Sequence, residues 1–222
     1  MCMRYSLFCV DELCGRFRVL DPVAGFVPHY NIAPGSTNPV IVKNGRIGAV
    51  PMQWGLVPHW VRDIKTAARP ANARAEGLTG KPIFAELLRT RRCLVPASGF
   101  FEWKQEGGHK VPFYFQVKEE PVFAFAGLFD VWRNPSGAML LTYTIITTAP
   151  NVLMTTIHDR MPAILMPDDE IRWVSREPIP AGDLFRMLTP YPPEEMVVHP
   201  VSERMNNAAV DDPLVIEPVR TL

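Results

Sequence analysis

The central part of this chain is a series of short strand-like segments joined by turns, and this series restricts the fold more than any other feature. The turns between the segments, such as QEGGHK and RNPSG, contain the glycine, proline and asparagine that favour chain reversal. A chain built this way forms a sheet rather than a bundle of helices. The strand-like segments cover residues 93–95, 99–104, 112–118, 122–131 and 140–148.

Further elements flank this series. Residues 39–54 predict a hairpin, with Asn44-Gly45 as a two-residue type I′ turn. The sequence predicts an α+β fold: a strand-rich single domain, residues 1–222, with a curved, barrel-like mixed sheet and short peripheral helices. Short helices are expected over 10–19, 82–92, 168–174 and 181–188, and a late strand over 195–201.

Composition excludes several classes of protein. The 23 Lys and Arg balance 23 Asp and Glu, which argues against coating nucleic acid by bulk charge but leaves room for a local arginine patch. No segment is long enough to span a membrane and no secretory signal is evident, so we expect a cytoplasmic protein without a membrane partner. The four cysteines form no CxxC pair, so we expect reduced thiols and neither a metal nor another cofactor.

The cysteine at position 2 offers unusual chemistry. Removal of Met1, which a small second residue usually permits, would leave an amine and a thiol on neighbouring carbons of Cys2. An aldehyde can react with both groups and close a five-membered thiazolidine. The ordinary pKa of an α-amine is about 7.7–8.0, so part of it is free to attack at neutral pH. Because many chains carry an inert cysteine here by chance, this interpretation depends on the other residues.

A carboxylate lies among aromatic residues on a predicted strand. Side chains alternate along a strand, so Phe100 and Glu102 share one face while Phe101 and Trp103 share the other. If the first face is buried, Glu102 favours its protonated form and suits general acid–base work. An edge-strand glutamate whose alkyl stem covers an aromatic ring is an equally good interpretation of the residue taken alone.

Two more polar segments, NARAE and IHDRMP, carry candidate functional residues. His158 in the second is by itself best explained as a loop histidine satisfied by the backbone. Asn72 in the first could be a turn residue. Arg4, Arg74 and Arg160 could each be surface charges, so none of these signals is specific alone.

Together these segments resemble the SRAP (SOS response-associated peptidase) family, whose members form covalent cross-links with abasic sites in single-stranded DNA. The resemblance runs nearly end to end and includes YNIAPGS, MQWGLVPHW, TYTIITTAPN and HPVSERMNN. It implies the SRAP fold and, as partner, single-stranded DNA that contains abasic sites. It also implies the family's four catalytic residues at Cys2, Asn72, Glu102 and His158.

The same resemblance implies a surface for DNA. The arginines expected to hold phosphates match positions 4 and 74, and a tryptophan and a proline are expected to line the groove. We expect the protein to act as a monomer. The implied DNA-binding residues are Arg4, Arg74, Trp60, Pro34 and Thr147.

The resemblance implies a mechanism as well. The amine of Cys2 attacks the ring-opened aldehyde of the abasic sugar and forms an imine, and the thiol then closes the thiazolidine. Glu102 shuttles protons, His158 assists ring opening and imine formation, and Asn72 orients the amine or the sugar. Two alternatives remain: a cysteine peptidase or amidase whose Met1 is removed autocatalytically, and a non-covalent reader of modified or single-stranded DNA.

Met3 departs from the family's usual Cys-Gly-Arg start. Glycine lets a backbone approach a ligand closely, so Met3 must either turn its side chain away or narrow the pocket. We expect a slower reaction than a glycine at this position would allow.

The family's usual N-terminal sequence, Cys-Gly-Arg, occurs again at Cys14-Gly15-Arg16, followed by Phe17, within the first predicted helix. Using Cys14 would require the removal of twelve further residues and would halve the distance to YNIAPG. We expect Cys2→Ala to abolish the heat-stable adduct with abasic-site DNA on a denaturing gel, and Cys14→Ala to leave the adduct intact. Loss of the adduct in Cys14→Ala alone would contradict the assignment.

Overall fold

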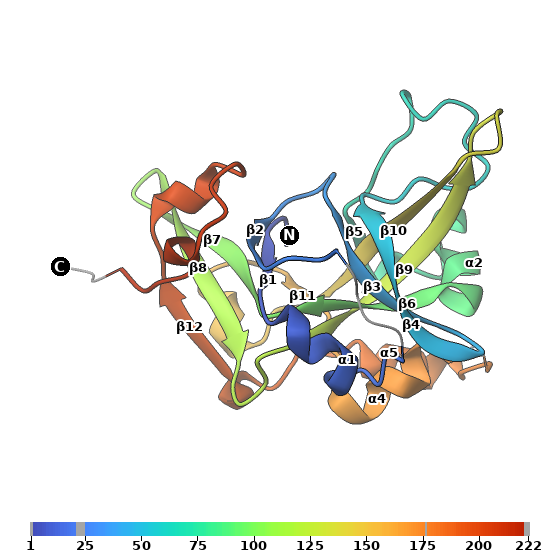
Figure 1. Cartoon of the computed structure of the whole chain (residues 1–222). Helices are drawn as coiled ribbons and strands as arrows, with labels where there is room; N and C mark the ends of the chain where they lie inside the picture. The colour runs from blue at the N-terminus through green and yellow to red at the C-terminus, as the bar shows by residue number, and fades with distance from the viewer. Residues whose placement is uncertain (1, 21–24, 176, 220–222) are drawn as a thin grey trace.

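The computed structural model, which describes residues 2–20, 25–175 and 177–219, contains a five-stranded barrel, seen on the right of Figure 1. The strands follow one another in the order β10-β4-β3-β6-β9, and β9 pairs back with β10, which closes the barrel. The barrel is mixed because β10 runs parallel to β4 and antiparallel to β9. The strands are β3 (Thr37–Asn44), β4 (Arg46–Trp54), β6 (Arg92–Ala97), β9 (Phe123–Arg133) and β10 (Met139–Thr148).

Two short strands pair with β10 near its carboxyl-terminal end, one on each side. β5 (Asn72–Arg74) runs parallel to it, with Asn72 beside Ile145 and Arg74 beside Thr147. β11 (Met161–Pro162) runs antiparallel and places Pro162 beside Thr147. The last residues of β10 therefore bring together the NARAE and IHDRMP segments, which lie far apart in the sequence.

A second, antiparallel sheet continues from the barrel in the order β12-β8-β7-β1-β2. Only Ser98 separates β6 of the barrel from β7 of this sheet. The first strand pairs with β7, which places Tyr5 opposite Phe100 and carries the start of the chain alongside β7. The strands are β1 (Tyr5–Leu7), β2 (His29–Ile32), β7 (Gly99–Glu106), β8 (His109–Val117) and β12 (Met196–Pro200).

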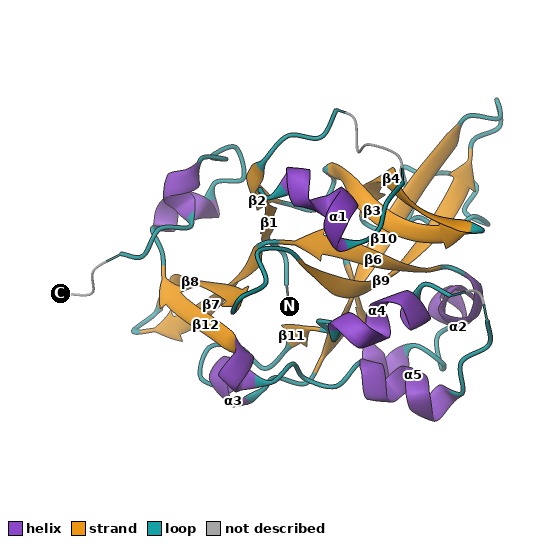
Figure 2. Ribbon diagram, turned by 60° about the horizontal axis from the view of Figure 1, so that its bottom comes forward, coloured by secondary structure: helices purple, strands orange, loops and turns teal. Residues whose placement is uncertain are grey.

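Short helices lie at the periphery (Figure 2). The longest, α2, starts with a proline at its first turn and buries Phe84, Leu87 and Leu88. Within the described residues no helix is long and apolar enough to cross a bilayer. The α-helices are α1 (Leu13–Arg16), α2 (Pro82–Thr90), α3 (Val152–Thr155), α4 (Pro167–Trp173) and α5 (Ala181–Met187); the 3₁₀ turns are η1 (Val10–Glu12), η2 (Ala75–Gly77), η3 (Pro193–Glu195), η4 (Glu203–Asn206) and η5 (Pro213–Val215).

Both faces of β7 are buried. Phe100 packs in the main core, stacked on Phe115 with ring centroids 5.0 Å apart. Phe101 belongs to a separate cluster with Tyr114 and Met205, which the carboxyl-terminal segment of the chain covers. The alternation along this strand therefore separates two cores, rather than a core from solvent.

The predicted fold class is confirmed, because the chain is strand-rich with a closed mixed barrel and short peripheral helices. The predicted two-residue turn is wrong in register. A type I′ turn at Asn44-Gly45 would pair Lys43 with Arg46, whereas the hairpin pairs Asn44 with Arg46 around Gly45, whose φ of 74° only glycine adopts readily.

The close packing of β7 on β8 predicts a sensitive glycine. A Cβ added at Gly99 would lie 2.2 Å from the ring of Tyr114, which is fully buried and whose hydroxyl is 2.6 Å from Ser6 Oγ. Since this ring cannot move freely, we expect Gly99→Ala to lower the free energy of unfolding by about 1–3 kcal/mol. Denaturant unfolding measures it, with Gly48→Ala as the control because nothing lies within 4 Å of a Cβ there. Equal stability of the two variants would show that the ring yields.

Candidate functional site

The first strand holds Cys2 inside the molecule. The backbone N–H of Phe101 donates to the carbonyl of Arg4 at 3.1 Å, which extends the β1–β7 pairing toward the chain start. Cys2 is fully buried, and its thiol donates to the same Arg4 carbonyl at 3.7 Å. The pairing with β7 therefore places the Cys2 thiol in the main core rather than at the surface.

Asn72 binds the backbone beside the cysteine. Its Nδ2 donates to the carbonyl oxygen of Cys2 at 2.8 Å and lies 3.4 Å from the sulfur of Met3. Its Oδ1 is buried and has no hydrogen-bond partner within the described part of the chain. Met3 keeps its thioether against Asn72 rather than turning it away, although the residue is 39% exposed.

Glu102 is a buried carboxyl group on β7, only 1% exposed. Burial, together with a smaller effect of the negative charge of Asp159, raises its pKa to about 7. Burial also raises the pKa of the Cys2 thiol, and the charge of Glu102 adds to that increase. The thiol and the carboxyl therefore lie close enough to interact electrostatically.

His158 follows α3 and faces Glu102, with Nε2 3.9 Å from Glu102 Oε2. The backbone N–H of Arg160 donates to His158 Nδ1 at 3.0 Å, while Asp159 Oδ1 lies 3.0 Å from the same nitrogen. The contact with the backbone N–H requires an unprotonated Nδ1, whereas the contact with the carboxylate requires a protonated one. The backbone donor cannot become an acceptor, whereas the Asp159 side chain is 84% exposed and can rotate, so Nδ1 accepts and Nε2 carries the proton.

The four residues implied to be catalytic thus lie in one cluster, linked from Asn72 through Cys2 and Glu102 to His158. Burial lowers the pKa of His158, which keeps its imidazole neutral at neutral pH. A carboxyl with a pKa of about 7 beside a neutral imidazole suits proton transfer at neutral pH.

The two arginines expected to hold phosphates differ in their surroundings. Arg4 is half-buried, burial lowers its pKa, and it donates to the carbonyls of Met3 at 3.3 Å and Asn206 at 3.4 Å. Arg74 is exposed on β5. Its neighbour Thr147 is fully buried and offers no surface to a DNA backbone, because β5 and β11 enclose it on both sides. The Thr147 hydroxyl has no hydrogen-bond partner among the described residues.

Trp60 and Pro34 lie on loops rather than in the cluster. Trp60 is 63% exposed on the loop that follows β4, which rises at the upper right of Figure 1. Asp130 anchors this loop, since its Oδ2 accepts from the backbone N–H of His59 at 2.8 Å. Pro34 is half-buried between β2 and β3. The hydrogen bonds that join the cluster include neither residue.

Sequence reasoning missed residues that close the site from the carboxyl-terminal side. Asn206 Oδ1 accepts from Trp103 Nε1 at 2.7 Å, and the Asn206 carbonyl accepts from Arg4. Asn31 Nδ2 holds the same segment by donating to the carbonyls of Met205, Asn207 and Val210. The only signal in the sequence was the HPVSERMNN motif, which contains Asn206 but not its partners.

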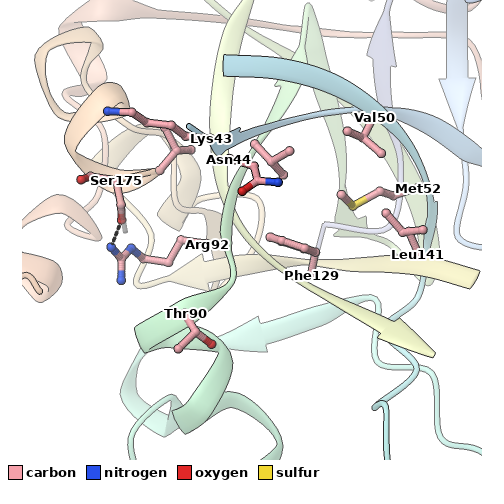
Figure 3. Close-up of a pocket in the computed structure, with 11 residues that line it drawn as sticks. Lys43, Asn44, Val50, Met52, Thr90, Arg92, Phe129, Leu141 and Ser175 are labelled. Atoms are coloured by element: carbon pink, nitrogen blue, oxygen red, sulfur yellow. Dashed lines mark hydrogen bonds between the residues drawn. The ribbon is translucent and has the colours of Figure 1, made fainter. Parts of the chain in front are cut away.

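A cavity of about 260 Å³ lies at the other end of β10 (Figure 3). Its floor is apolar, with Met52, Phe129 and Leu141. Arg92 at its edge is committed to backbone carbonyls, including those of Trp173 and Ser175. The cavity therefore offers none of the acid–base groups of the cluster, and we assign the functional site to the cluster. The described residues include no group of three His, Cys, Asp or Glu side chains placed to hold a metal ion.

The fold and cluster define a strand-rich α+β protein with a cysteine at position 2 beside a buried carboxyl and a histidine. The chain belongs to the SRAP family, since the family described as SOS response associated peptidase (SRAP) matches residues 1–208. The resemblance drawn from the sequence is thereby confirmed.

Similar proteins agree with this assignment. The abasic site processing protein YoqW of Bacillus subtilis (strain 168) is 38% identical over 98% of this chain and 99% of its own length. The abasic site processing protein HMCES of Xenopus tropicalis is 33% identical over 85% of this chain and 65% of its own length. A crystal structure of a Bacteroides thetaiotaomicron protein, 29% identical, matches 99% of this chain and 100% of that chain with a TM-score of 0.89.

Burial of Glu102 predicts a dependence of stability on pH. A raised pKa means that the folded state holds the proton more tightly, so stability falls as pH rises from the ordinary value of 4.5 to the folded value of about 7. Glutamine has no such loss. As pH rises from about 4.5 to about 8, we expect the free energy of unfolding of Glu102→Gln to increase by on the order of 3 kcal/mol relative to that of the natural protein. Urea unfolding across this range measures it, and a difference that does not vary with pH would refute it.

Proposed function

We propose that this protein recognises abasic sites in single-stranded DNA and binds them covalently through Cys2 after Met1 is removed. The observation that carries the proposal is the cluster itself: Asn72 holds the Cys2 backbone, and Glu102, with a pKa of about 7, interacts electrostatically with the thiol and lies 3.9 Å from His158 Nε2. Membership of the SRAP family and relatives named abasic site processing proteins support the same function.

The chemistry begins at the amine of Cys2. The amine adds to the aldehyde carbon of the ring-opened sugar, and the resulting carbinolamine loses water to give an imine. The thiol sulfur then adds to the imine carbon while the thiol proton passes to nitrogen, which closes the thiazolidine. No oxidant or cofactor is consumed, and one water is released.

The surrounding residues supply and remove protons. Near its pKa of about 7, Glu102 can protonate the departing hydroxyl as an acid and accept a proton as a base. The Nε2–H of His158 can donate to the sugar oxygen during ring opening. Asn72 already binds the Cys2 carbonyl, and its Oδ1, which has no partner among the described residues, is available for the amine or the sugar. Holding the reactants together can replace about 7–11 kcal/mol of barrier.

The state of the thiol favours this chemistry over hydrolysis by a cysteine peptidase. A thiol peptidase requires a thiolate at neutral pH, whereas burial and the charge of Glu102 raise the pKa of Cys2. In the cross-linking reaction the amine attacks first, and the thiol adds later within the same residue. A protonated thiol is therefore no obstacle to the first step.

Arginines and an exposed aromatic residue account for binding of the DNA strand. Arg74 is exposed beside the cluster, and Arg4 lies between the cluster and the carboxyl-terminal segment. Phosphate contacts from these residues would weaken with added salt. Trp60, 63% exposed, is available for a neighbouring base to stack on. An abasic site has no base to extrude, so recognition avoids the cost of base flipping.

Incubation with an abasic-site oligonucleotide, followed by a denaturing gel, tests the function. We expect a heat-stable adduct whose mass equals protein without Met1 plus DNA less one water. Because acid–base groups contribute about 10²–10⁴-fold, Glu102→Gln should slow adduct formation at least 100-fold while leaving DNA affinity nearly unchanged.

Other outcomes would favour the alternatives. Peptide cleavage in trans without an adduct would favour a peptidase. Normal binding by Cys2→Ala, with no adduct from the natural protein, would favour a non-covalent reader. Arg74→Ala serves as the contrasting variant, since it should weaken binding and reduce its salt dependence.

A further inference from the structure

Arg160 connects three segments that surround the cluster. Its guanidinium forms a two-pronged ion pair with Glu76, with NH1 2.6 Å from Oε1 and NH2 3.0 Å from Oε2. NH2 also donates to the carbonyl of Thr147 at 2.6 Å. The side chain therefore links the turn after β5, the end of β10 and the loop that carries His158.

The backbone of the same arginine forms a hydrogen bond with the histidine. Its N–H donates to His158 Nδ1 at 3.0 Å, which leaves the proton on Nε2, the nitrogen 3.9 Å from Glu102. A residue whose side chain is held at three points has little freedom to move its backbone. The orientation of the imidazole thus depends on the ion pair on the other side of Arg160.

Glu76 adds little to folding by itself. Its side chain is 61% exposed, and exposed ion pairs contribute little to stability. The Arg160 side chain is only 12% exposed, and its Nε has no hydrogen-bond partner among the described residues. Without the carboxylate, NH1 of Arg160 would lose its acceptor, and NH2 would keep only the Thr147 carbonyl. Two parallel hydrogen bonds give geometric specificity, so the role of Glu76 is one of position.

We infer that Glu76 is a positioning residue that acts through Arg160 to hold His158 in its Nε2–H form, facing Glu102. This inference rests on the proposed function for its kinetic effect, but not for its effect on the histidine. The pair also ties the segment that carries Asn72 to the loop that carries His158, so one ion pair aligns both sides of the cluster.

The first measurement does not require any reaction. The ¹⁵N chemical shifts of the His158 ring distinguish the two neutral tautomers in the free protein. We expect one tautomer, protonated at Nε2, in the natural protein and a mixture in Glu76→Gln. The same single tautomer in both proteins would overturn the inference, whether or not the protein forms adducts.

The second measurement is a double-mutant cycle on adduct formation. Misplacement of a catalytic group can cost up to about 100-fold, and we expect Glu76→Gln to slow the single-turnover rate about 10-fold, with a DNA dissociation constant within twofold of the natural one. In a His158→Ala background, Glu76→Gln should cause no further slowing, because the two residues act in series. Glu76→Asp, which retains the charge, should recover part of the rate.

A matched control removes an ion pair elsewhere. Asp183→Asn breaks the contacts of Asp183 with Arg172 and Arg186 on α4 and α5, and it should change neither the tautomer nor the rate. Equal slowing by Glu76→Gln with and without His158 would overturn the inference. Tighter DNA binding by Glu76→Gln, with an unchanged tautomer, would instead make Glu76 a competitor of phosphate for Arg160. Absence of any adduct from the natural protein would defeat the proposed function and leave the tautomer measurement decisive.

Discussion

Backbone hydrogen bonds between the first strand and β7 fix the position of Cys2, and every feature of the proposed site depends on them. The N–H of Ser98 donates to the carbonyl of Ser6 at 2.7 Å, and the N–H of Phe101 donates to that of Arg4 at 3.1 Å. A chain start is usually poorly ordered unless a sheet holds it. Here the sheet carries Cys2 into the core beside Glu102, where both the thiol and the carboxyl lose their hydration.

The buried position of Glu102 has an energetic cost. A buried carboxyl destabilises the folded state at any pH at which it must ionise. An apolar residue on this face of β7 would pack with Phe100 at no such cost. In the proposed mechanism, proton transfer by Glu102 offsets this loss of stability, and perturbed pKa values commonly cluster at functional sites.

The sequence was informative where structure is local. Alternating apolar residues and turn residues located β7 to β10. The aromatic neighbours of Glu102 left burial and an edge-strand position equally open, and in the structure the residue is buried. Long-range features were beyond such patterns. Nothing near Thr147 indicates that β5 and β11 enclose it, and nothing in the first residues indicates that Cys2 would be buried. The turn at Gly45 shows that even a strong dipeptide signal leaves the register open by one residue.

The end of β10 explains why motifs so distant in sequence form one site. Asn72 and Arg74 enter beside Ile145 and Thr147 on one side, and Pro162 enters on the other. Backbone pairing sets these segments side by side but leaves their side chains free to rotate. Arg160 supplies the missing constraint, since its guanidinium joins Glu76 to the Thr147 carbonyl while its N–H orients the imidazole. Strand pairing therefore assembles the cluster, and side-chain ion pairing orients it. If the inference holds, a substitution at the exposed carboxylate of Glu76 alters chemistry at the partly buried His158 without altering the fold.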